Sequence, residues 1–299
     1  MKIGILGLGA IGSVLAAHLK KKEGVKFYYY NRSPRKAIEL QYEEDVIYQS
    51  ITCQTKLEKK IGLDWLIICL KEHQYTNIEI WLSKLTTPLT KVVVLRNGIN
   101  LKKSIDNYCQ DNPILEAIID CPTQALGVGR YQQLKRAKIT VSDSDLGLEF
   151  ATLFETKGLV VQPCSDFKTE SWKKVCESAS LGAILCLSGT TCWIFKDPKI
   201  RQIYLELLNE SILVARADGA QISALFKPQM LEKIDQYPMS KSSSMLSDRL
   251  SGQRIELGAK NGIISNLSKV YKIATPLNDW ACTLLKYTNV NSSEPNNKL

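Results

Sequence analysis

The chain has 299 residues, of which 44% are hydrophobic and 23% charged, so it can bury one large core or two ordinary globular cores. Its formal net charge of +9 suits anionic ligands such as a phosphorylated cofactor or a carboxylate, but a generally basic surface would give the same number. Its lysine runs lack interleaved aromatic residues, its apolar stretches are too short to span a membrane, and it has only two histidines, so we expect no nucleic-acid partner, no membrane insertion and no metal site.

The chain begins with an apolar run, residues 3–6, followed by a glycine-rich turn and an amphipathic segment. The glycines of the turn have the spacing G-x-G-x-x-G, and the order strand, glycine turn, helix is typical of a dinucleotide-binding motif. Gly7 permits the tight turn, Gly9 lets a pyrophosphate approach the backbone, and Gly12 lets the helix pack close to the strand. A turn that binds nothing is the alternative. The residues predicted to bind the cofactor here are Gly7, Leu8, Gly9, Ala10, Ile11 and Gly12.

The second predicted strand, residues 25–31, ends in Asn31 and Arg32. NAD-specific sites usually carry Asp or Glu at this place to bind the ribose 2′-hydroxyl. A guanidinium can instead hold a 2′-phosphate in a bidentate contact. We therefore predict that Arg32 binds the 2′-phosphate and that the cofactor is NADPH, the alternative being an ordinary surface arginine.

Two further polar residues follow predicted buried strands. Lys71 comes after the strand at 63–70, and Asn97 after the strand at 92–95. Because ligands bind beyond the carboxyl ends of strands in doubly wound sheets, Lys71 is predicted to contact a phosphate or ribose, and Asn97 a nicotinamide ribose or a substrate oxygen. A solvated lysine and an Asn-Gly turn are the alternatives.

The remaining patterns divide the chain into two parts. Up to residue 165, strand and helix patterns alternate, which predicts a doubly wound α/β domain of the Rossmann type. From residue 166 strand signals nearly vanish, which predicts an all-helical domain over 166–299. Further strands are expected at 114–119, 137–141 and 159–162, short strands or a hairpin at 46–54, and helices at 76–85 and 146–155. Helices of the second domain are expected at 167–188, 198–218, 225–236, 243–249, 255–271 and 277–287, before a frayed tail at 291–299.

The helical part must supply the groups that act on a substrate. Lys173 and Lys174 are adjacent on the first long helix, so only one can face a site, and a lysine there can protonate a ketone oxygen as hydride arrives at the carbon. A solvated lysine pair is the alternative. Serines at 242–244 precede a helix and can offer hydroxyls to a carboxylate, whereas Glu256 is by its residue type most often a surface residue.

Nine cysteines, an odd number without a CxxC pair, predict reduced thiols. The strand predicted to begin directly after Met1 leaves no room for a targeting peptide, so a cytoplasmic location is expected.

The ordered set of motifs resembles the ketopantoate reductase (2-dehydropantoate 2-reductase) family over nearly the whole chain. The resemblance implies a Rossmann domain followed by a helical domain, NADPH as cofactor, a 2-oxo acid as substrate and, as one option, a homodimer. The matching pieces are GLGAIG at 7–12, Asn31-Arg32, LKEHQ at 70–74, RNG at 96–98, WKK at 172–174, SSM at 243–245 and IE at 255–256.

Position by position, the resemblance implies a set of roles. Lys174 would be the general acid, and Glu256 would support the substrate or the lysine. Ser244 would bind the substrate carboxylate, with Asn97 contacting cofactor and substrate. Arg32 and Lys71 would bind the ribose phosphate.

The sequence departs from the family pattern around the substrate. Two asparagines expected after the catalytic lysine are replaced by Ser178 and Gly182. Ser178 would then be the residue that contacts the substrate at this place. A third expected asparagine is replaced near Cys192, and Arg96 stands where Gln or His is common. Each lost hydrogen bond is worth about 0.5–1.5 kcal/mol, so the substrate can be another 2-oxo acid.

Two other functions stay open from the sequence. One is a 3-hydroxyacid dehydrogenase of the 6-phosphogluconate dehydrogenase type, although the glycine-rich segment usual before its lysine helix is missing. The other is an NADPH-binding protein with little or no catalysis.

Overall fold

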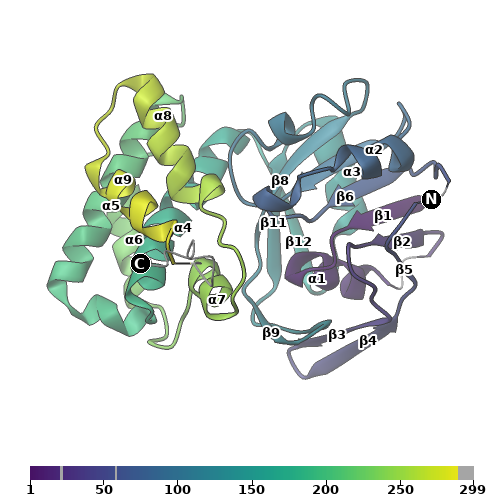
Figure 1. The fold of residues 1–299 in the computed structure, drawn as a ribbon, viewed down its shortest axis with the longest axis horizontal. Helices are drawn as coiled ribbons and strands as arrows, with labels where there is room; N and C mark the ends of the chain where they lie inside the picture. Colours follow the sequence, from purple (N-terminus) through teal and green to yellow (C-terminus); the bar gives the residue numbers. More distant parts are fainter. Residues whose placement is uncertain (21–22, 58, 289–299) are drawn as a thin grey trace, which may run out of the picture. The chain divides into compact units, whose positions relative to one another are not determined.

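The computed structural model describes residues 1–20, 23–57 and 59–288. It divides into two compact units, one from Met1 to Phe167 and one beginning at Lys168 (Figure 1). The first unit is built on β-strands and the second on helices. This mixed α/β architecture, with strands first and helices after, is the fold class predicted from the sequence.

An eight-stranded sheet forms the centre of the first unit. Its strands are β1 (Lys2–Leu6), β2 (Lys26–Tyr30), β5 (Cys53–Gln54), β6 (Trp65–Ile68), β7 (Lys91–Leu95), β8 (Ile114–Asp120), β11 (Ala137–Ser142) and β12 (Leu159–Cys164). Their spatial order is β12-β11-β8-β7-β6-β1-β2-β5. The strands pair in parallel, except that β8 and β11 are antiparallel. The chain reverses its direction of travel across the sheet between β1 and β6, which is where ligands bind in folds of this kind.

Helices cover both faces of this sheet. Alternate residues of the strands join one of two apolar cores, because successive side chains of a strand point to opposite faces. One core contains Ile3 and Ile5 and is covered by α1 (Ala10–Leu19) and α3 (Asp145–Phe154). The other contains Leu66 and Ile68 and is covered by α2 (Glu79–Leu85) and the 3-10 turn η2 (Leu101–Ser104).

A second, four-stranded sheet packs against α1. Its order is β4-β3-β10-β9, formed by β3 (Ala37–Tyr42), β4 (Asp45–Ser50), β9 (Thr123–Gly127) and β10 (Arg130–Gln133). Ile38, Leu40 and Tyr131 share the core of Val14 and Leu15, so α1 is enclosed between the two sheets. Of the two possibilities expected at 46–54, the short strands are confirmed as β4 and β5, and the hairpin is wrong, because β4 pairs with β3 whereas β5 pairs with β2.

The second unit consists of helices in the described residues 168–288. They are α4 (Phe167–Ser188, whose first residue closes the first unit), α5 (Pro198–Ala217), α6 (Phe226–Asp235), α7 (Ser244–Leu250), α8 (Ile263–Tyr271) and α9 (Pro276–Leu285), with the 3-10 turn η3 (Cys192–Lys196).

The single helix expected at 255–271 is wrong in its first half. Residues 255–257 are not helical, and a π-turn, η4 (Gly258–Gly262), precedes α8. The Gly262 N–H donates to the Leu257 carbonyl over 2.9 Å, and a Cβ at Gly262 would lie only 2.9 Å from the same oxygen. A glycine lets this wide turn close.

Several other features concern the chain as a whole. The nine cysteines, all within the described ranges, are free thiols. His18 is structural, since its Nε2 lies 2.7 Å from Gln133 Oε1 and its ring packs edge-on against Tyr42.

In the part of the chain that the structure describes, no helix is both long and apolar enough to cross a bilayer, and no group of three or more His, Cys, Asp or Glu side chains could hold a metal ion. The tail expected at 291–299 lies outside the described residues.

Candidate functional site

The glycine turn joins β1 to α1 at the reversal point of the sheet. Gly7 has φ of +97°, and a Cβ there would lie 2.9 Å from the Cys69 carbonyl oxygen. A Cβ at Gly12 would lie 1.9 Å from the Gly7 carbonyl oxygen, whereas a Cβ at Gly9 would meet nothing within 4 Å. Gly7 and Gly12 are therefore required by the protein itself, and Gly9 borders open space at the start of α1. This is the cradle that a dinucleotide pyrophosphate needs.

The side chains of the other turn residues pack into the core, so these residues present backbone atoms rather than side chains to a ligand. Leu8 is buried in the core, and Ala10 and Ile11 pack against it. The Leu8 N–H donates to Asn31 Oδ1 over 3.2 Å, and the Asn31 amide donates to the Ser33 carbonyl over 2.9 Å. Asn31 thus ties the end of β2 to the glycine turn.

Arg32 follows Asn31 directly and is exposed. No acidic residue occupies the end of β2, where Asn31 and Arg32 stand. The position is therefore cationic, and a carboxylate that would repel a 2′-phosphate is not present there.

Lys71 and Asn97 lie at the same edge of the sheet, beyond the ends of β6 and β7. Lys71 is half-buried and begins the 3-10 turn η1 (Glu72–Gln74), where its N–H donates to Gln74 Oε1 over 2.9 Å. Asn97 Oδ1 accepts the Ile119 N–H of β8 over 3.3 Å, which fixes the amide and leaves its Nδ2 group to act as donor. Sequence position alone thus placed these residues at the edge where the glycine turn lies.

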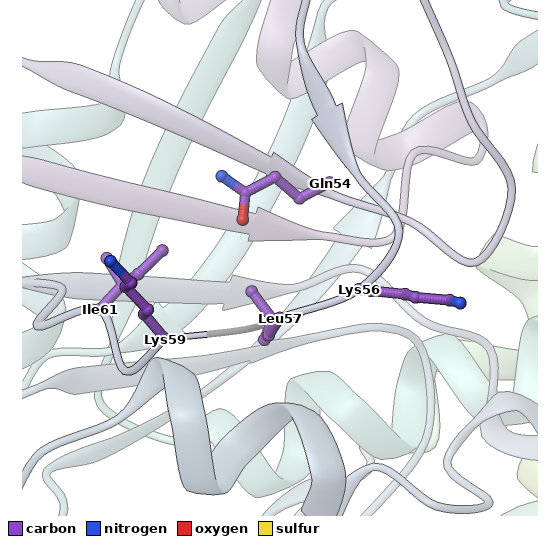
Figure 2. A pocket seen from close by; sticks show the side chains of 5 residues that line it. All are labelled: Gln54, Lys56, Leu57, Lys59 and Ile61. Carbon is purple, nitrogen blue, oxygen red and sulfur yellow. The ribbon is translucent and has the colours of Figure 1, made fainter.

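A separate hollow lies beside β5. It is lined by Gln54, Lys56, Leu57, Lys59 and Ile61, and Figure 2 shows Lys56 extending away from the other four side chains. It contains none of the residues predicted to bind cofactor or substrate.

In the second unit, α4 carries the predicted lysine. Trp172 is fully buried, and its Nε1 donates to Asp218 Oδ2 over 2.9 Å, which fixes the rotation of the helix. Lys173 forms an ion pair with Glu170 over 2.8 Å. Lys174 is half-buried on a different side of the helix.

Glu177 lies one turn after Lys174 and is part of a charged cluster. Its carboxylate accepts from Lys233 Nζ over 2.7 Å and from the Tyr237 hydroxyl over 2.8 Å. Burial acts to raise the pKa of Glu177, but the charges of Lys174 and Lys233 and these hydrogen bonds outweigh it and hold the pKa below its usual value. Lys174 therefore has an ionised carboxylate close by.

The two asparagine replacements on α4 have different surroundings. The Ser178 hydroxyl, one turn after Lys174, donates to the Val175 carbonyl over 3.4 Å. At Gly182 a Cβ would lie 2.7 Å from Met245 Sδ. The space that an asparagine would fill at Gly182 is thus taken by a methionine of α7. Cys192, at the third replaced position, is buried.

Ser244 opens α7 and is exposed, next to Met245. Its Oγ accepts a hydrogen bond from Lys260 Nζ over 2.9 Å. Glu256 is partly buried and lies in the segment before η4, not on the helix where it was expected. The second unit brings Gly182, Ser244 and Lys260 together through α7.

Lys260 was missed by the sequence reasoning. A lysine within a helical pattern usually indicates a solvated face, yet this one is only 4% exposed. The signal available was the pair of glycines, Gly258 and Gly262, which bracket it and interrupt a regular helix.

Comparisons with known proteins cover both units. The family model described as ketopantoate reductase PanE/ApbA matches residues 3–145, and the model of its C-terminal part matches residues 166–289. A 2-dehydropantoate 2-reductase of Caulobacter vibrioides is 29% identical over 283 residues, covering 95% of this chain and 97% of that protein. One from Mycobacterium tuberculosis is 28% identical over 285 residues, covering 95% and 96%.

Solved structures share the fold at low sequence identity. A dimeric ketopantoate reductase from Staphylococcus aureus has a TM-score of 0.86 at 20% identity, covering 97% of this chain and 99% of that one. A D-mandelate dehydrogenase solved with NADH and anilino(oxo)acetate has a TM-score of 0.85 at 18% identity, covering 97% and 98%. With both family models matched in order along the chain, the protein belongs to the ketopantoate reductase family of oxidoreductases.

Proposed function

We propose that the protein reduces a 2-oxo acid to a 2-hydroxy acid with NADPH, with 2-dehydropantoate to pantoate as the nominal reaction. The observation that carries the proposal is the match of the family models along both units. The relatives from Caulobacter vibrioides and Mycobacterium tuberculosis bear the name of this activity. The first unit, roughly 1–165, would hold the cofactor, and the helical part, 166–299, would supply the catalytic and substrate-binding groups.

The choice of NADPH over NADH rests on the end of β2. Asn31 is engaged with Leu8 and Ser33, and the next side chain is the exposed Arg32. A guanidinium at this point can form a bidentate contact with a 2′-phosphate, whereas NAD sites place a carboxylate there. Lys71, at the same edge of the sheet, would add a second positive charge. The open space at Gly9 fits the pyrophosphate.

The roles of the individual residues in this proposal follow from the family resemblance. Bound NADPH supplies a hydride to the carbonyl carbon of the substrate. Lys174 would give a proton to the carbonyl oxygen as the hydride reaches the carbon, so that the product is the 2-hydroxy acid and the lysine is left neutral. Asn97 would donate from its Nδ2 group to the substrate or the ribose, Glu256 would support the substrate or Lys174, and Ser178 and Ser244 would contact the substrate.

A reductase for a different 2-oxo acid is the second candidate. It is favoured by the contact between Gly182 and Met245, which puts an apolar thioether where the family pattern has an amide. A 3-hydroxyacid dehydrogenase and a protein that binds NADPH without turnover are the further alternatives.

The decisive assay follows NADPH oxidation with a panel of 2-oxo acids. Turnover of 2-dehydropantoate supports the nominal reaction, and a preference for another acid supports the second candidate. Reaction confined to 3-hydroxy acids with NADP⁺, or tight NADPH binding without any turnover, would refute the proposal.

We also propose a homodimer. The Staphylococcus aureus relative is described as dimeric, and an apolar hollow lined by Ile184, Leu187, Ile203, Leu277 and Trp280 lies on the second unit. Light scattering coupled to size-exclusion chromatography should give twice the 33.6 kDa chain mass, and a single chain mass would refute the dimer.

A further inference from the structure

Lys241 is a half-buried lysine in the loop that leads from α6 to α7 (Figure 1). Its N–H donates to the Pro238 carbonyl over 2.9 Å, and its carbonyl accepts from the Cys192 N–H over 2.9 Å. The Trp193 N–H donates to the Met239 carbonyl over 3.0 Å, so two main-chain hydrogen bonds bind this loop to η3. The place of Lys241 in the fold is therefore fixed by bonds that do not involve its ammonium.

The ammonium of Lys241 faces an aromatic ring. Its Nζ lies 4.4 Å from the centroid of the Tyr237 ring, which is a cation–π contact. Among the residues that the structure describes, no carboxylate lies within ion-pair distance of this Nζ and no oxygen accepts a hydrogen bond from it. The ring holds the ammonium by its negative face and uses none of the three N–H donors. These donors are available to a ligand.

The Tyr237 side chain connects Lys241 to the helix of the predicted proton donor. Its hydroxyl donates to Glu177 Oε1 over 2.8 Å, and the same carboxylate forms an ion pair with Lys233 over 2.7 Å. The charge of Lys233 is thus compensated by Glu177. Since Glu177 lies one turn after Lys174 on α4, a single tyrosine side chain separates Lys241 from the residues of that turn.

The loop of Lys241 also contacts a position where the chain departs from the family pattern. Cys192, whose N–H binds the Lys241 carbonyl, marks the third place where an expected asparagine is missing. Burial raises the pKa of the Cys192 thiol to about 11, and the Lys241 charge acts in the opposite direction, so the ammonium is near the thiol. A neutral amide is therefore absent at a place where a positive charge is present.

A ligand that covers Lys241 must take the place of the water around the ammonium. Removing a charge from water is costly unless an opposite charge and hydrogen-bond acceptors replace that water. The apolar chain of a simple 2-oxo monoacid offers neither. An anionic group on that chain offers both.

We propose that Lys241 is a specificity-determining residue and that the substrate is a 2-oxo acid with a second anionic group, a carboxylate or a phosphate. In this proposal the Lys241 ammonium binds the second group, and the reaction itself is unchanged: the carbonyl gains a hydride from NADPH and a proton from Lys174. The inference rests on the proposed function and deepens its second candidate, a 2-oxo acid other than 2-dehydropantoate.

The test compares pairs of 2-oxo acids that differ in the second group. 2-Oxoglutarate is paired with 2-oxopentanoate for a carboxylate, and 3-phosphohydroxypyruvate with 3-hydroxypyruvate for a phosphate. For at least one pair, kcat/KM of wild type should be about 10-fold or more higher for the dianionic acid, because a hydrogen bond to a charged group is gained. The pair with the larger ratio identifies the second group.

Variants of Lys241 assign this preference to its charge. Lys241→Gln should lower the ratio of kcat/KM between the two acids of that pair about 10- to 100-fold, chiefly through KM of the dianionic acid. Lys241→Arg keeps the charge and can stack on the Tyr237 ring, so it should retain most of the preference. Lys269→Gln, at an exposed lysine of α8, is the matched control and should behave as wild type.

The outcomes distinguish this inference from the function on which it rests. A wild-type chain that reduces no 2-oxo acid overturns the proposed function and the inference together. A wild type with a higher kcat/KM for 2-dehydropantoate than for either dianionic acid overturns the inference alone. An equal loss for both acids of a pair in Lys241→Gln would show that Lys241 contacts a group common to them or supports the fold, and would overturn it as well.

Discussion

The α-carbon of Gly12 faces the carbonyl oxygen of Gly7 so closely that a Cβ would lie 1.9 Å from that oxygen. The first turn of α1 and the glycine turn are thus in backbone contact. Gly9, between them, has open space instead. Packing therefore requires a glycine at position 12, whereas it places no such demand on position 9.

Replacing Gly12 with Ala should destabilise the protein. In an ordinary helix this change stabilises by about 1 kcal/mol, but here the new methyl group would meet rigid backbone. We expect a net loss of about 1–3 kcal/mol in the free energy of unfolding, as for overpacked sites. Urea unfolding followed by circular dichroism measures it.

Gly9→Ala is the matched control for that variant. Its unfolding free energy should stay close to that of wild type, because the methyl group meets no protein atom. Its NADPH affinity should fall, since the methyl group would stand against the pyrophosphate. Unchanged NADPH binding in Gly9→Ala would show that the phosphates bind elsewhere.

Replacing Arg32 with Asp should change the cofactor preference. The loss of a charge-assisted contact should weaken NADPH binding about 10- to 100-fold, while NADH binding changes little. Fluorescence titration with both nucleotides measures this, with Lys36→Asp, another exposed cation nearby, as the control. Equal losses for both cofactors would remove Arg32 from the 2′-phosphate site.

Gly182→Asn should destabilise the second unit. The new Cβ would lie 2.7 Å from Met245 Sδ, so the side chain of this buried methionine must move. We expect a cost of about 1–3 kcal/mol, partly recovered when Met245→Ala is added. Thermal melting of the single and double variants tests this, and no change in melting temperature would mean that the two side chains repack freely.

Asp218 should make stability depend on pH. Its carboxylate accepts from Trp172 over 2.9 Å, from Tyr271 over 2.6 Å and from Lys168 over 3.1 Å. Burial acts to raise the pKa of Asp218, but these three partners outweigh it and lower the pKa below the usual 3.8. The stabilisation is therefore fully present above pH 3.8 and lost as pH falls through the lower pKa of the folded state.

The variant Asp218→Asn should lack the part of the pH dependence of stability that the Asp218 carboxylate causes. Its unfolding free energy should be lower than that of wild type at neutral pH, and the difference should shrink as pH falls below 3.8. Urea unfolding between pH 7 and pH 3 gives both curves. Parallel curves for the two proteins would show that Asp218 has the same pKa folded and unfolded.

The sequence predicted the elements whose signals are local. The strands β1, β6 and β7 were recognisable as short continuous apolar runs, and the 22-residue helix α4 was recognisable because its apolar content extends over a length that only a helix reaches. The small sheet was missed, because β3 pairs with β10 across about 90 residues and no local pattern names a strand's partner.

Among the candidate site residues, too, those placed by local patterns were predicted and those that depend on long-range packing were not. Arg32, Lys71 and Asn97 were correctly placed beyond the ends of strands, because strand ends are visible in the sequence, and their binding roles stay predictions. Lys260 was missed because burial depends on how α7 packs over the π-turn. In the same way, the sequence showed at Gly182 only that an expected asparagine is missing. It could not show that Met245, 63 positions later in the chain, fills the space of that asparagine side chain.

The central claim is that Lys174 protonates a 2-oxo acid reduced by NADPH. The most direct measurement is the rate of NADPH oxidation with 2-dehydropantoate for wild type, Lys174→Ala and Lys173→Ala. We predict that kcat falls about 100- to 10,000-fold in Lys174→Ala. Lys173→Ala should stay near wild type because it loses only a surface ion pair. Equal activity of wild type and Lys174→Ala, with 2-dehydropantoate turned over by both, would contradict the account.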